Sequence, residues 1–386
     1  MPPARPRRFA TRAPAVVLAL SVLVLTSCAS LLASAPAPPP GTSGEPPGSP
    51  AAPAHGAGYG LPEVTGTVYY VSPEGSDASP GTFEEPFQTI TFALKALEPG
   101  DGLFLRGGTY VEQVRSPVVS PASEATPIVV TAYPGERPII KGLFWIKQAS
   151  HWYFDGINVT WDPERNLPNE HMVKLIDGEG WVFQNSELWD AHSFAALLIY
   201  GSATDWTVRG NYIHDTHPTN GLNQDHLIYA NVNGAGLIEN NLLVGAANGQ
   251  GVKVGSYEPE GGEIHDVTIR RNTIVAAVGP AGVQLIWGAY DTVVEQNIIV
   301  GVYQGAAGIE TWELFGTGNT AGQNVVWDAA AVLEQAAGLS DTGGNVMLDP
   351  LLDSRGLPAN PQAQGRGFYP VTGDGWSIAA DIFRPT

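Results

Sequence analysis

The chain has 386 residues, of which 43% are hydrophobic and 15% charged, and this length fits one large domain or two small ones. Its 46 glycines and 32 prolines argue against a protein of long helices, because proline interrupts the helical hydrogen-bond pattern. Lys and Arg number 19 against 38 Asp and Glu, so the net charge is −19. Such a surface repels phosphate backbones, and we expect no nucleic-acid partner. The single cysteine excludes an intrachain disulfide framework and a cysteine-based zinc site.

Residues 1–28 predict an export signal rather than part of the fold. Four arginines precede the apolar run Ala13–Leu25, which is short for a membrane span. The run ends in Leu25-Thr-Ser-Cys28, which resembles the lipobox of bacterial lipoproteins. The resemblance implies cleavage before Cys28 and a lipid on its sulfur, so that the exported protein is anchored to the outer face of a bacterial membrane. An ordinary signal peptide with an incidental cysteine is the alternative.

Residues 29–64 are rich in Pro, Ala and Gly and cannot form a packed core. We expect a disordered, semi-extended tether there, followed by one folded domain over residues 65–386. The folded chain is expected to be a monomer.

One four-residue phrase that ends in asparagine recurs between residues 182 and 324, as in Val182–Asn185 and Val294–Asn297. Successive spacings are 26, 30, 31, 25 and 27 residues, a period typical of solenoids. Short β-branched runs without helical periodicity favour a β-solenoid. The repeated residues, expected to stack into a hydrogen-bonded ladder, are Asn185, Asn211, Asn241, Asn272, Asn297 and Asn324.

A second strand follows each of the first five asparagines. Strand alternation sends every other residue inward, and the prediction places Leu197, Leu227, Tyr229, Val252 and Val254 among the inward residues. Neighbours in the outward column should lie about 4.8 Å apart, the spacing of paired strands. That predicted column consists of Leu198, Ile228, Lys253, Gln284 and Glu310, with Lys174 two turns before Ile228.

Several segments carry a resemblance to known proteins. Tyr69–Asp77, Pro86–Ile90 and Pro99–Tyr110 are similar to the opening of right-handed parallel β-helix proteins. Ala132–Gly142 resembles a phrase of the chondroitinase-B/alginate-lyase-like branch of the pectate-lyase-like superfamily, and Asn345–Pro350 and Gly375–Ile378 resemble its closing segment.

The resemblance implies an all-β fold, a single-stranded right-handed parallel β-helix with a short N-terminal capping helix over Thr89–Leu97. It leaves the activity open, because the superfamily includes lyases, hydrolases, epimerases and non-catalytic adhesins.

Two turns of the solenoid are longer than the others. The turn before the second strand of the Asn211 repeat gains about four residues, and the segment Gly255–Val267 gains six. Long loops on one face of a solenoid commonly form its binding face. We expect these insertions to wall a trough whose floor carries His226, Lys253, Gln284 and Glu310. The first insertion holds His214, Asp215, His217, Asn220, Asn223, Gln224 and Asp225.

A polysaccharide lyase needs a base for the proton next to a uronate carboxyl, a cation for that carboxylate, and an acid for the leaving oxygen. Lys253 is the candidate base, with a solvated surface lysine as the alternative. Asp225-His226 loosely resembles part of the Asp-Pro-His-Asp phrase of mannuronan C5-epimerases, but a structural turn histidine is equally open. His214, next to Asp215, is a further catalytic candidate or else part of a capped turn.

Acidic and aromatic residues supply candidates for binding. Glu258, Glu260 and Glu263 are candidate Ca²⁺ ligands, since Ca²⁺ prefers clustered carboxylates, but a solvated acidic loop explains them equally. Gln284 and Glu310 are candidate subsite contacts. Tyr257, Trp287 and Trp312 are candidates for stacking on sugar rings, with packing under a loop as the alternative for the two tryptophans.

Three functions therefore remain open. The first is a lyase or C5-epimerase that acts on uronate-containing polysaccharide by proton abstraction. The second is a non-catalytic carbohydrate-binding or envelope-associated lipoprotein. The third is a glycoside hydrolase with a carboxylate pair drawn from Asp215, Asp225, Glu310 or residues 258–266.

Overall fold

The computed structural model describes residues 59–116, 122–167, 170–218, 224–256, 263–277, 279, 281–334 and 336–370. Cys28, Asn220, Asn223, Tyr257, Glu258 and Glu260 lie outside these residues, so export, lipid attachment and the central part of the second insertion stay predictions. Among the described residues, no helix has the length and apolarity to cross a membrane.

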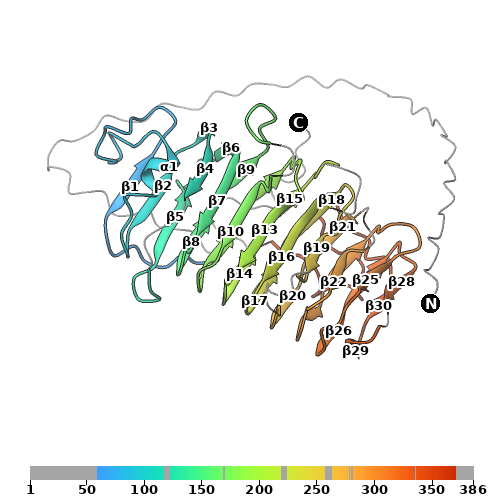
Figure 1. Cartoon of the computed structure of the whole chain (residues 1–386). Coiled ribbons are helices and arrows are strands. Elements are labelled where there is room, and N and C mark those ends of the chain that lie inside the picture. The colour runs from blue at the N-terminus through green and yellow to red at the C-terminus, as the bar shows by residue number, and fades with distance from the viewer. Residues whose placement is uncertain are drawn as a thin grey trace, which may run out of the picture. The chain divides into compact units, whose positions relative to one another are not determined.

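Three parallel sheets, here called A, B and C, wind around a common core (Figure 1). The chain passes from A to B to C in each turn, and each strand pairs with its counterparts one turn before and one turn after. This is the architecture of a single-stranded parallel β-helix, as the sequence predicts.

The strand bounds are as follows. Sheet A contains β1 (Val68–Val71), β2 (Gly102–Leu105), β5 (Ile128–Ala132), β8 (Trp152–Asp155), β11 (Val182–Gln184), β14 (Trp206–Arg209), β17 (Gly236–Glu239), β20 (Val267–Arg270), β23 (Val293–Glu295), β26 (Asn319–Gly322) and β29 (Leu339–Gly343). Sheet B contains β3 (Gly108–Tyr110), β6 (Pro138–Lys141), β9 (Asn158–Thr160), β12 (Glu187–Trp189), β15 (Tyr212–His214), β18 (Leu242–Ala246), β21 (Thr273–Ala277), β24 (Ile298–Val300), β27 (Val325–Trp327) and β30 (Val346–Met347). Sheet C contains β4 (Gln113–Ser116), β7 (Leu143–Lys147), β10 (Val173–Ile176), β13 (Ala195–Gly201), β16 (His226–Val232), β19 (Val252–Val254), β22 (Val283–Ile286), β25 (Ala307–Trp312) and β28 (Ala331–Leu333).

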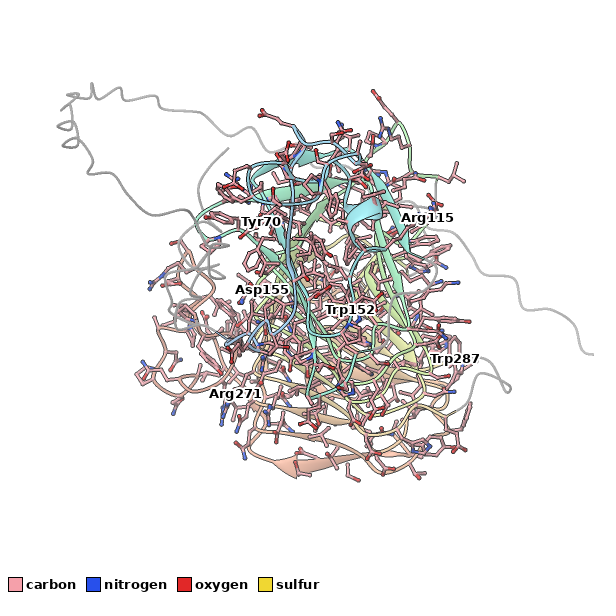
Figure 2. The ribbon with its side chains drawn as sticks, turned by 90° about the vertical axis from the view of Figure 1, so that its left-hand side faces the viewer. Tyr70, Arg115, Trp152, Asp155, Arg271 and Trp287 are labelled. Carbon is pink, nitrogen blue, oxygen red and sulfur yellow. The ribbon has the colours of Figure 1, made fainter. Side chains whose placement is uncertain are left out.

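The interior is filled by side chains that stack from turn to turn. Phe154 lies 5.6 Å from Phe144, 5.9 Å from Trp152 and 6.5 Å from Phe183 between ring centroids, and all four are fully buried. A view along the solenoid axis places Arg115 and Trp287 on one side of the ribbon and Arg271 on the opposite side (Figure 2). The outward face of sheet C and the turn between sheets A and B therefore face different directions.

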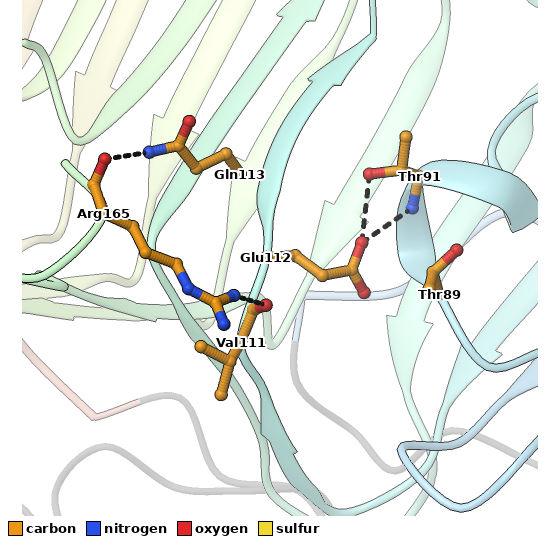
Figure 3. Close-up of a pocket in the computed structure, with 6 residues that line it drawn as sticks. All are labelled: Thr89, Thr91, Val111, Glu112, Gln113 and Arg165. Carbon is orange, nitrogen blue, oxygen red and sulfur yellow. Dashed lines mark hydrogen bonds between the residues drawn. The ribbon is translucent and has the colours of Figure 1, made fainter.

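The N-terminal helix is shorter than predicted. Helix α1 spans only Ile90–Ala93, with Thr89 as its N-cap, and the chain then continues in turns to Leu97. Ile90, Leu94 and Leu97 are nevertheless buried against the first turns, so the segment covers core as expected. The Glu112 carboxylate accepts hydrogen bonds from the backbone N–H groups of Ile90 and Thr91. Figure 3 shows its two bonds with Thr91, one from the backbone N–H and one from the hydroxyl. Thr91, Glu112 and Arg165 are among the residues that line a pocket of about 500 Å³ beside β4.

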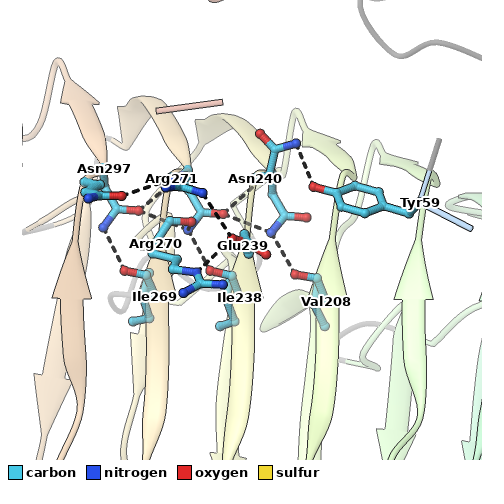
Figure 4. Close-up of polar contacts among 12 residues, drawn as sticks. Tyr59, Val208, Ile238, Glu239, Asn240, Ile269, Arg270, Arg271 and Asn297 are labelled. Atoms are coloured by element: carbon cyan, nitrogen blue, oxygen red, sulfur yellow. Dashed lines mark hydrogen bonds and ion pairs between the residues drawn. The ribbon is translucent and has the colours of Figure 1, made fainter. Parts of the chain in front are cut away.

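An asparagine ladder joins the turns between sheets A and B. In Asn211, Asn241, Asn272, Asn297 and Asn324, the side-chain amide and the backbone N–H both donate to the Oδ1 of the next ladder asparagine, at 2.9–3.1 Å. The ladder continues to Asn345, and the five preceding members are fully buried. Figure 4 shows Asn297 of this ladder, which also donates to the Ile269 carbonyl. The prediction of a ladder is confirmed for these five residues.

Asn185 is not a member of the ladder, which corrects the prediction. Gln184 pairs with Arg209, so the ladder position next to Asn211 belongs to Ser186. The backbone N–H of Ser186 donates to Asn211 Oδ1 at 3.0 Å. Asn185 instead occupies the preceding position, where the chain turns with positive φ in every one of these turns. Asparagine tolerates that left-handed conformation better than most residues, which explains the misleading match.

The N-terminal end of the described chain is attached to the same edge of the solenoid. Tyr59 Oη accepts a hydrogen bond from Asn240 Nδ2 at 2.8 Å, and its backbone carbonyl accepts one from Gln184 Nε2 at 3.1 Å. The Arg209 guanidinium lies 4.4 Å from the centre of the Tyr59 ring. Tyr59 is therefore held by β11, β14 and the turn after β17, in the middle of the solenoid (Figure 4).

We expect Asn272→Leu to lower the free energy of unfolding by about 2–4 kcal/mol, because the change leaves buried donors and a carbonyl without partners, each costing roughly 1–3 kcal/mol. Asn345→Leu, at the partly exposed end of the ladder, should cost much less, because water replaces the lost bonds. Urea unfolding of both variants checks this. Equal losses at the two positions would show that the ladder is not a cooperative, buried network.

Candidate functional site

The outward face of sheet C carries one continuous column of side chains. The register pairs Lys174 with Leu198, Leu198 with Tyr229, and Tyr229 with Lys253. Lys253 then pairs with Gln284, and Gln284 with Glu310. The predicted alignment of Lys253, Gln284 and Glu310 is confirmed.

Strand β16 corrects one part of the prediction. Ile228 pairs with Leu197 and is fully buried, so it faces the core, whereas Tyr229 faces outward beside Lys253. The prediction had the two residues exchanged. The first insertion shifts the start of this strand by one residue relative to its siblings, and a shift of one residue exchanges the two faces of a strand.

Lys253 lies in an aromatic environment. Its Nζ is 5.4 Å from the centre of the Tyr229 ring and 6.0 Å from that of Trp287. Burial lowers the pKa of Lys253 to about 8, since a partly dehydrated ammonium group is less stable than a neutral amine. The flanking Gly251 is required by packing, because a Cβ there would lie 2.4 Å from Ile274 Cγ2. Lys253 therefore carries an amine able to exist in neutral form near physiological pH.

Glu310 forms the other perturbed group of the column. Gln284, which is 1% exposed, donates from Nε2 to Glu310 Oε1 at 2.7 Å. Burial, with a contribution from Glu334, raises the pKa of Glu310 to about 7. Gln284 thus lies between the Lys253 amine, whose pKa is lowered to about 8, and the Glu310 carboxyl group, whose pKa is raised to about 7.

Basic and aromatic side chains alternate along the N-terminal part of the same face. Arg115 stacks over Trp145 at 4.1 Å, and Lys174 Nζ lies 5.5 Å from the Trp145 ring and 4.8 Å from the Tyr200 ring. Burial and the neighbouring Lys147 lower the pKa of Lys174. Although the chain is acidic overall, this part of sheet C is locally basic and presents flat rings.

His226 does not lie on the floor of the trough, which corrects the prediction. It is 2% exposed, and its Nδ1 accepts a hydrogen bond from the backbone N–H of Gln250 at 3.1 Å. Burial, together with Lys253, holds the pKa of His226 well below its usual range. Asp225 is also fully buried, and its backbone carbonyl accepts a bond from Thr216 Oγ1. Both side chains are thus enclosed at the turn into β16.

His214 belongs to sheet B, away from the Lys253 column. Its Nδ1 contacts Asp215 at 2.8 Å, its Nε2 contacts Glu187 at 3.1 Å, and its ring stacks on Tyr212 with centroids 4.0 Å apart. Both ring nitrogens are thus engaged within β12 and β15, and the structure does not bring His214 to Lys253.

The remaining predicted binding residues have different surroundings. Trp287 donates from Nε1 to Glu313 at 3.2 Å and borders Lys253, whereas Trp312 is 56% exposed at the end of β25. Glu263 contacts His265 Nε2 at 3.0 Å. Of the predicted Ca²⁺ ligands only Glu263 is described, and its carboxylate is directed to a histidine.

The two insertions leave sheet C at opposite edges of neighbouring strands. The first connects β15 to β16, between sheets B and C, and the second connects β19 to β20, between sheets C and A. Residues 219–223 and 257–262 at their centres lie outside the described residues. The outward residues between the two attachment points are Tyr229 and Lys253.

A further polar cluster was missed by sequence reasoning. Asp190, His192 and His217 present three ligand atoms within 4.8 Å of one another, at the turns from sheet B to sheet C. The sequence does contain a signal for it: Asp-Ala-His at 190–192 is repeated as Asp-Thr-His at 215–217, 25 residues later. His217 is among the residues named from the sequence, but His192, its counterpart one turn earlier, is not.

Comparisons with known proteins agree with this architecture. Residues 69–209 match the family model described as "Pel9A-like, right handed beta helix region". "Pectate lyase PEL9" of Emericella nidulans is 31% identical over 128 residues, which are 33% of this chain and 29% of that protein. The curated relatives that match are each covered over less than a third of their length.

Solved structures extend the similarity to most of the described chain. The crystal structure of pectate lyase Pel9A superposes with a TM-score of 0.53 at 16% identity, covering 80% of this chain and 88% of that one. A glycoside hydrolase superposes with a TM-score of 0.56 at 10% identity, covering 79% and 99% respectively. At these identities the likeness establishes the fold. The match over residues 69–209 and the three-sheet solenoid together support a pectate-lyase-like parallel β-helix fold for this chain.

Proposed function

We propose that the protein is a polysaccharide lyase for uronate-containing glycans, with Lys253 as the base. The observation that carries the proposal is the lowered pKa of Lys253 at the centre of an outward column between two insertions. A base works best when its pKa lies near the operating pH, because it is then both deprotonated and strong enough to take a proton.

The chemical step balances without a water nucleophile. The neutral amine of Lys253 takes the proton on the carbon next to the uronate carboxylate. The released electron pair forms a carbon–carbon double bond, and the bond to the glycosidic oxygen breaks. The leaving oxygen takes up a proton from solvent, the Lys253 ammonium group later releases its proton to solvent, and the product is an unsaturated uronate.

The rest of the sheet C face supports binding of an extended anionic chain. Lys174 lies three strands from Lys253, about 14 Å at the usual strand spacing, and Arg115 two strands further. The Lys174 ammonium group suits a uronate carboxylate, and a carboxylate at Arg115 would compete with Glu170, its salt-bridge partner. Trp145, Tyr200 and Tyr229 offer rings for stacking. The proposal leaves both lyase and C5-epimerase chemistry available, since both begin with the same proton abstraction.

Calcium is a further part of the proposal, with Glu258, Glu260 and Glu263 as its predicted ligands. An ion bound there would supply positive charge to a uronate carboxylate. Glu263 contacts His265 through Oε2, so its other carboxylate oxygen is the one offered to an ion while that contact is kept.

A second candidate function rests on Glu310. A glycoside hydrolase needs one carboxyl group that stays protonated near neutral pH, and burial raises the pKa of Glu310 to about 7. Glu334 follows Leu333, the partner of Ile309, so its backbone lies one strand from that of Glu310. Its carboxylate contributes to the raised pKa of Glu310 and is the candidate second carboxyl group.

Lys253→Ala should lower lyase activity at least about 100-fold, the usual contribution of a general base. The measurement is the ultraviolet absorbance of unsaturated product from alginate, pectate and glycosaminoglycans, with and without calcium. Lys95→Ala removes an exposed lysine after α1 and serves as the matched control. Full activity of Lys253→Ala contradicts the assignment of the base. Absence of both product and new reducing ends on every polymer favours the carbohydrate-binding alternative.

The activity should rise with pH through about 8, because only the neutral amine of Lys253 accepts a proton. A lysine with the ordinary pKa of about 10.4 would shift that rise by more than two pH units. The lowered pKa has a matching effect on stability: the folded state is penalised below pH 8, and the penalty disappears above the unfolded pKa. Lys253→Met should therefore raise the melting temperature at pH 7 more than at pH 10. A gain independent of pH would refute the lowered pKa.

If the protein is a hydrolase, Glu310→Gln abolishes the release of reducing ends, and Lys253→Ala leaves it largely intact. Reducing ends would then appear without ultraviolet absorbance. Glu74→Gln, a change at an exposed position, controls for the loss of one negative charge. Retention of activity in Glu310→Gln excludes this carboxyl as the acid.

A further inference from the structure

Two histidines and an aspartate meet at the turns between sheets B and C because of the repeat. Trp189 pairs with His214, so the three residues after β12 lie beside the three residues after β15. The backbone N–H of His217 donates to the carbonyl of Ala191 at 2.8 Å, which continues the same register into the turns. His192 and His217 consequently occupy equivalent positions on neighbouring turns, and their rings stack with centroids 4.2 Å apart and 11° between planes.

The ligand atoms of the cluster converge on one carboxylate oxygen. Asp190 Oδ1 lies 2.5 Å from His217 Nε2 and 4.0 Å from His192 Nε2. The side chains are 42–49% exposed, so they can adjust without disturbing the core. Atoms bound at about 2.0–2.1 Å around one tetrahedral zinc ion are roughly 3.3 Å apart, and the two observed distances bracket this value.

The surroundings favour a cation. The carboxylates of Asp190 and of the buried Asp225 both attract positive charge at His192. The ring of Trp161 lies 5.9 Å from His192 on the preceding turn, and the positions on the following turn hold Gly245 and Ala247. The cluster therefore faces an aromatic wall on one side and small residues on the other.

We propose that Asp190, His192 and His217 form a binding site for a divalent transition-metal ion of the zinc class, with one carboxylate oxygen and two Nε2 atoms as ligands. Three protein ligands leave at least one coordination position for water or an oxygen of a bound sugar. Two imidazoles select zinc-class ions over calcium, which prefers oxygen ligands. The site does not depend on the proposed lyase activity, since its ligands belong to different turns from Lys253.

Calorimetric titration of metal-stripped, tag-free protein with Zn²⁺ tests the proposal. We expect one high-affinity ion per chain, weakened at least tenfold in His192→Ala and in His217→Ala. Asp190→Asn keeps the shape and removes the charge, and should weaken binding as well. Co²⁺ in place of Zn²⁺ should give visible absorption bands from a coordinated ion, lost in the same variants. Ca²⁺ should not displace either ion.

His265→Ala is the matched control. His265 also lies between two carboxylates, but it contacts Glu263 through Nε2 at 3.0 Å and Asp291 through Nδ1 at 3.6 Å, so its ring separates them. This variant should bind Zn²⁺ like the unaltered protein. Failure to bind, or equal affinity in His192→Ala, His217→Ala and His265→Ala, overturns the assignment. Thermal unfolding without metal verifies that all variants are folded.

Discussion

The parallel register between successive turns is the constraint on which the rest of this protein depends. A parallel strand pair fixes which residue lies beside which, and the buried asparagine ladder holds that relation at the turn from sheet A to sheet B. A ladder member cannot slip by one residue without leaving several buried polar atoms unpaired. The number of residues in each repeat therefore determines which side chains lie next to each other on the outer faces.

Successive turns of the solenoid present equivalent positions, and the residues at these positions differ from turn to turn. On sheet C the same outward position is occupied in turn by Lys174, Leu198, Tyr229, Lys253, Gln284 and Glu310. The column thus changes from cationic to acidic over a few strands. At the turns from sheet B to sheet C, the repeated position instead carries histidine twice in succession, which creates a pair of stacked rings. The first pattern suits a long ligand that spans many turns, and the second suits a compact one.

Much of this was accessible from the sequence, because the repeat gives the period and alternation gives the faces. Five ladder asparagines, the strands of sheet C, and the alignment of Lys253 with Gln284 and Glu310 follow from counting residues. Counting residues gave the wrong position or the wrong face where one turn differs in length or register from the other turns. Asn185 matched the phrase but not the register, and the insertion before β16 exchanged the faces of Ile228 and Tyr229.

Burial was the other property that spacing did not reveal. His226 follows an insertion and begins a strand of sheet C, yet its ring is enclosed and bonded to the next turn. The pKa values of Lys253 and Glu310 depend on the aromatic rings and neighbouring strands that surround them. Such effects need three-dimensional neighbours, and a linear pattern supplies only the candidates.

The attachment of Tyr59 has a mechanical consequence. Because its ring and backbone are held by Gln184, Arg209 and Asn240, a force that pulls on the chain from its N-terminal side reaches the solenoid at these middle turns. Strand β1, although first among the strands, is separated from Tyr59 by residues 60–67, of which Thr65 and Gly66 are bonded to the Gly100 carbonyl. The force acts across the strands of several turns that the asparagine ladder binds together, rather than peeling the first strand from the end of the sheet. The point of attachment thus lies at the middle of the solenoid, on the edge that faces away from Lys253.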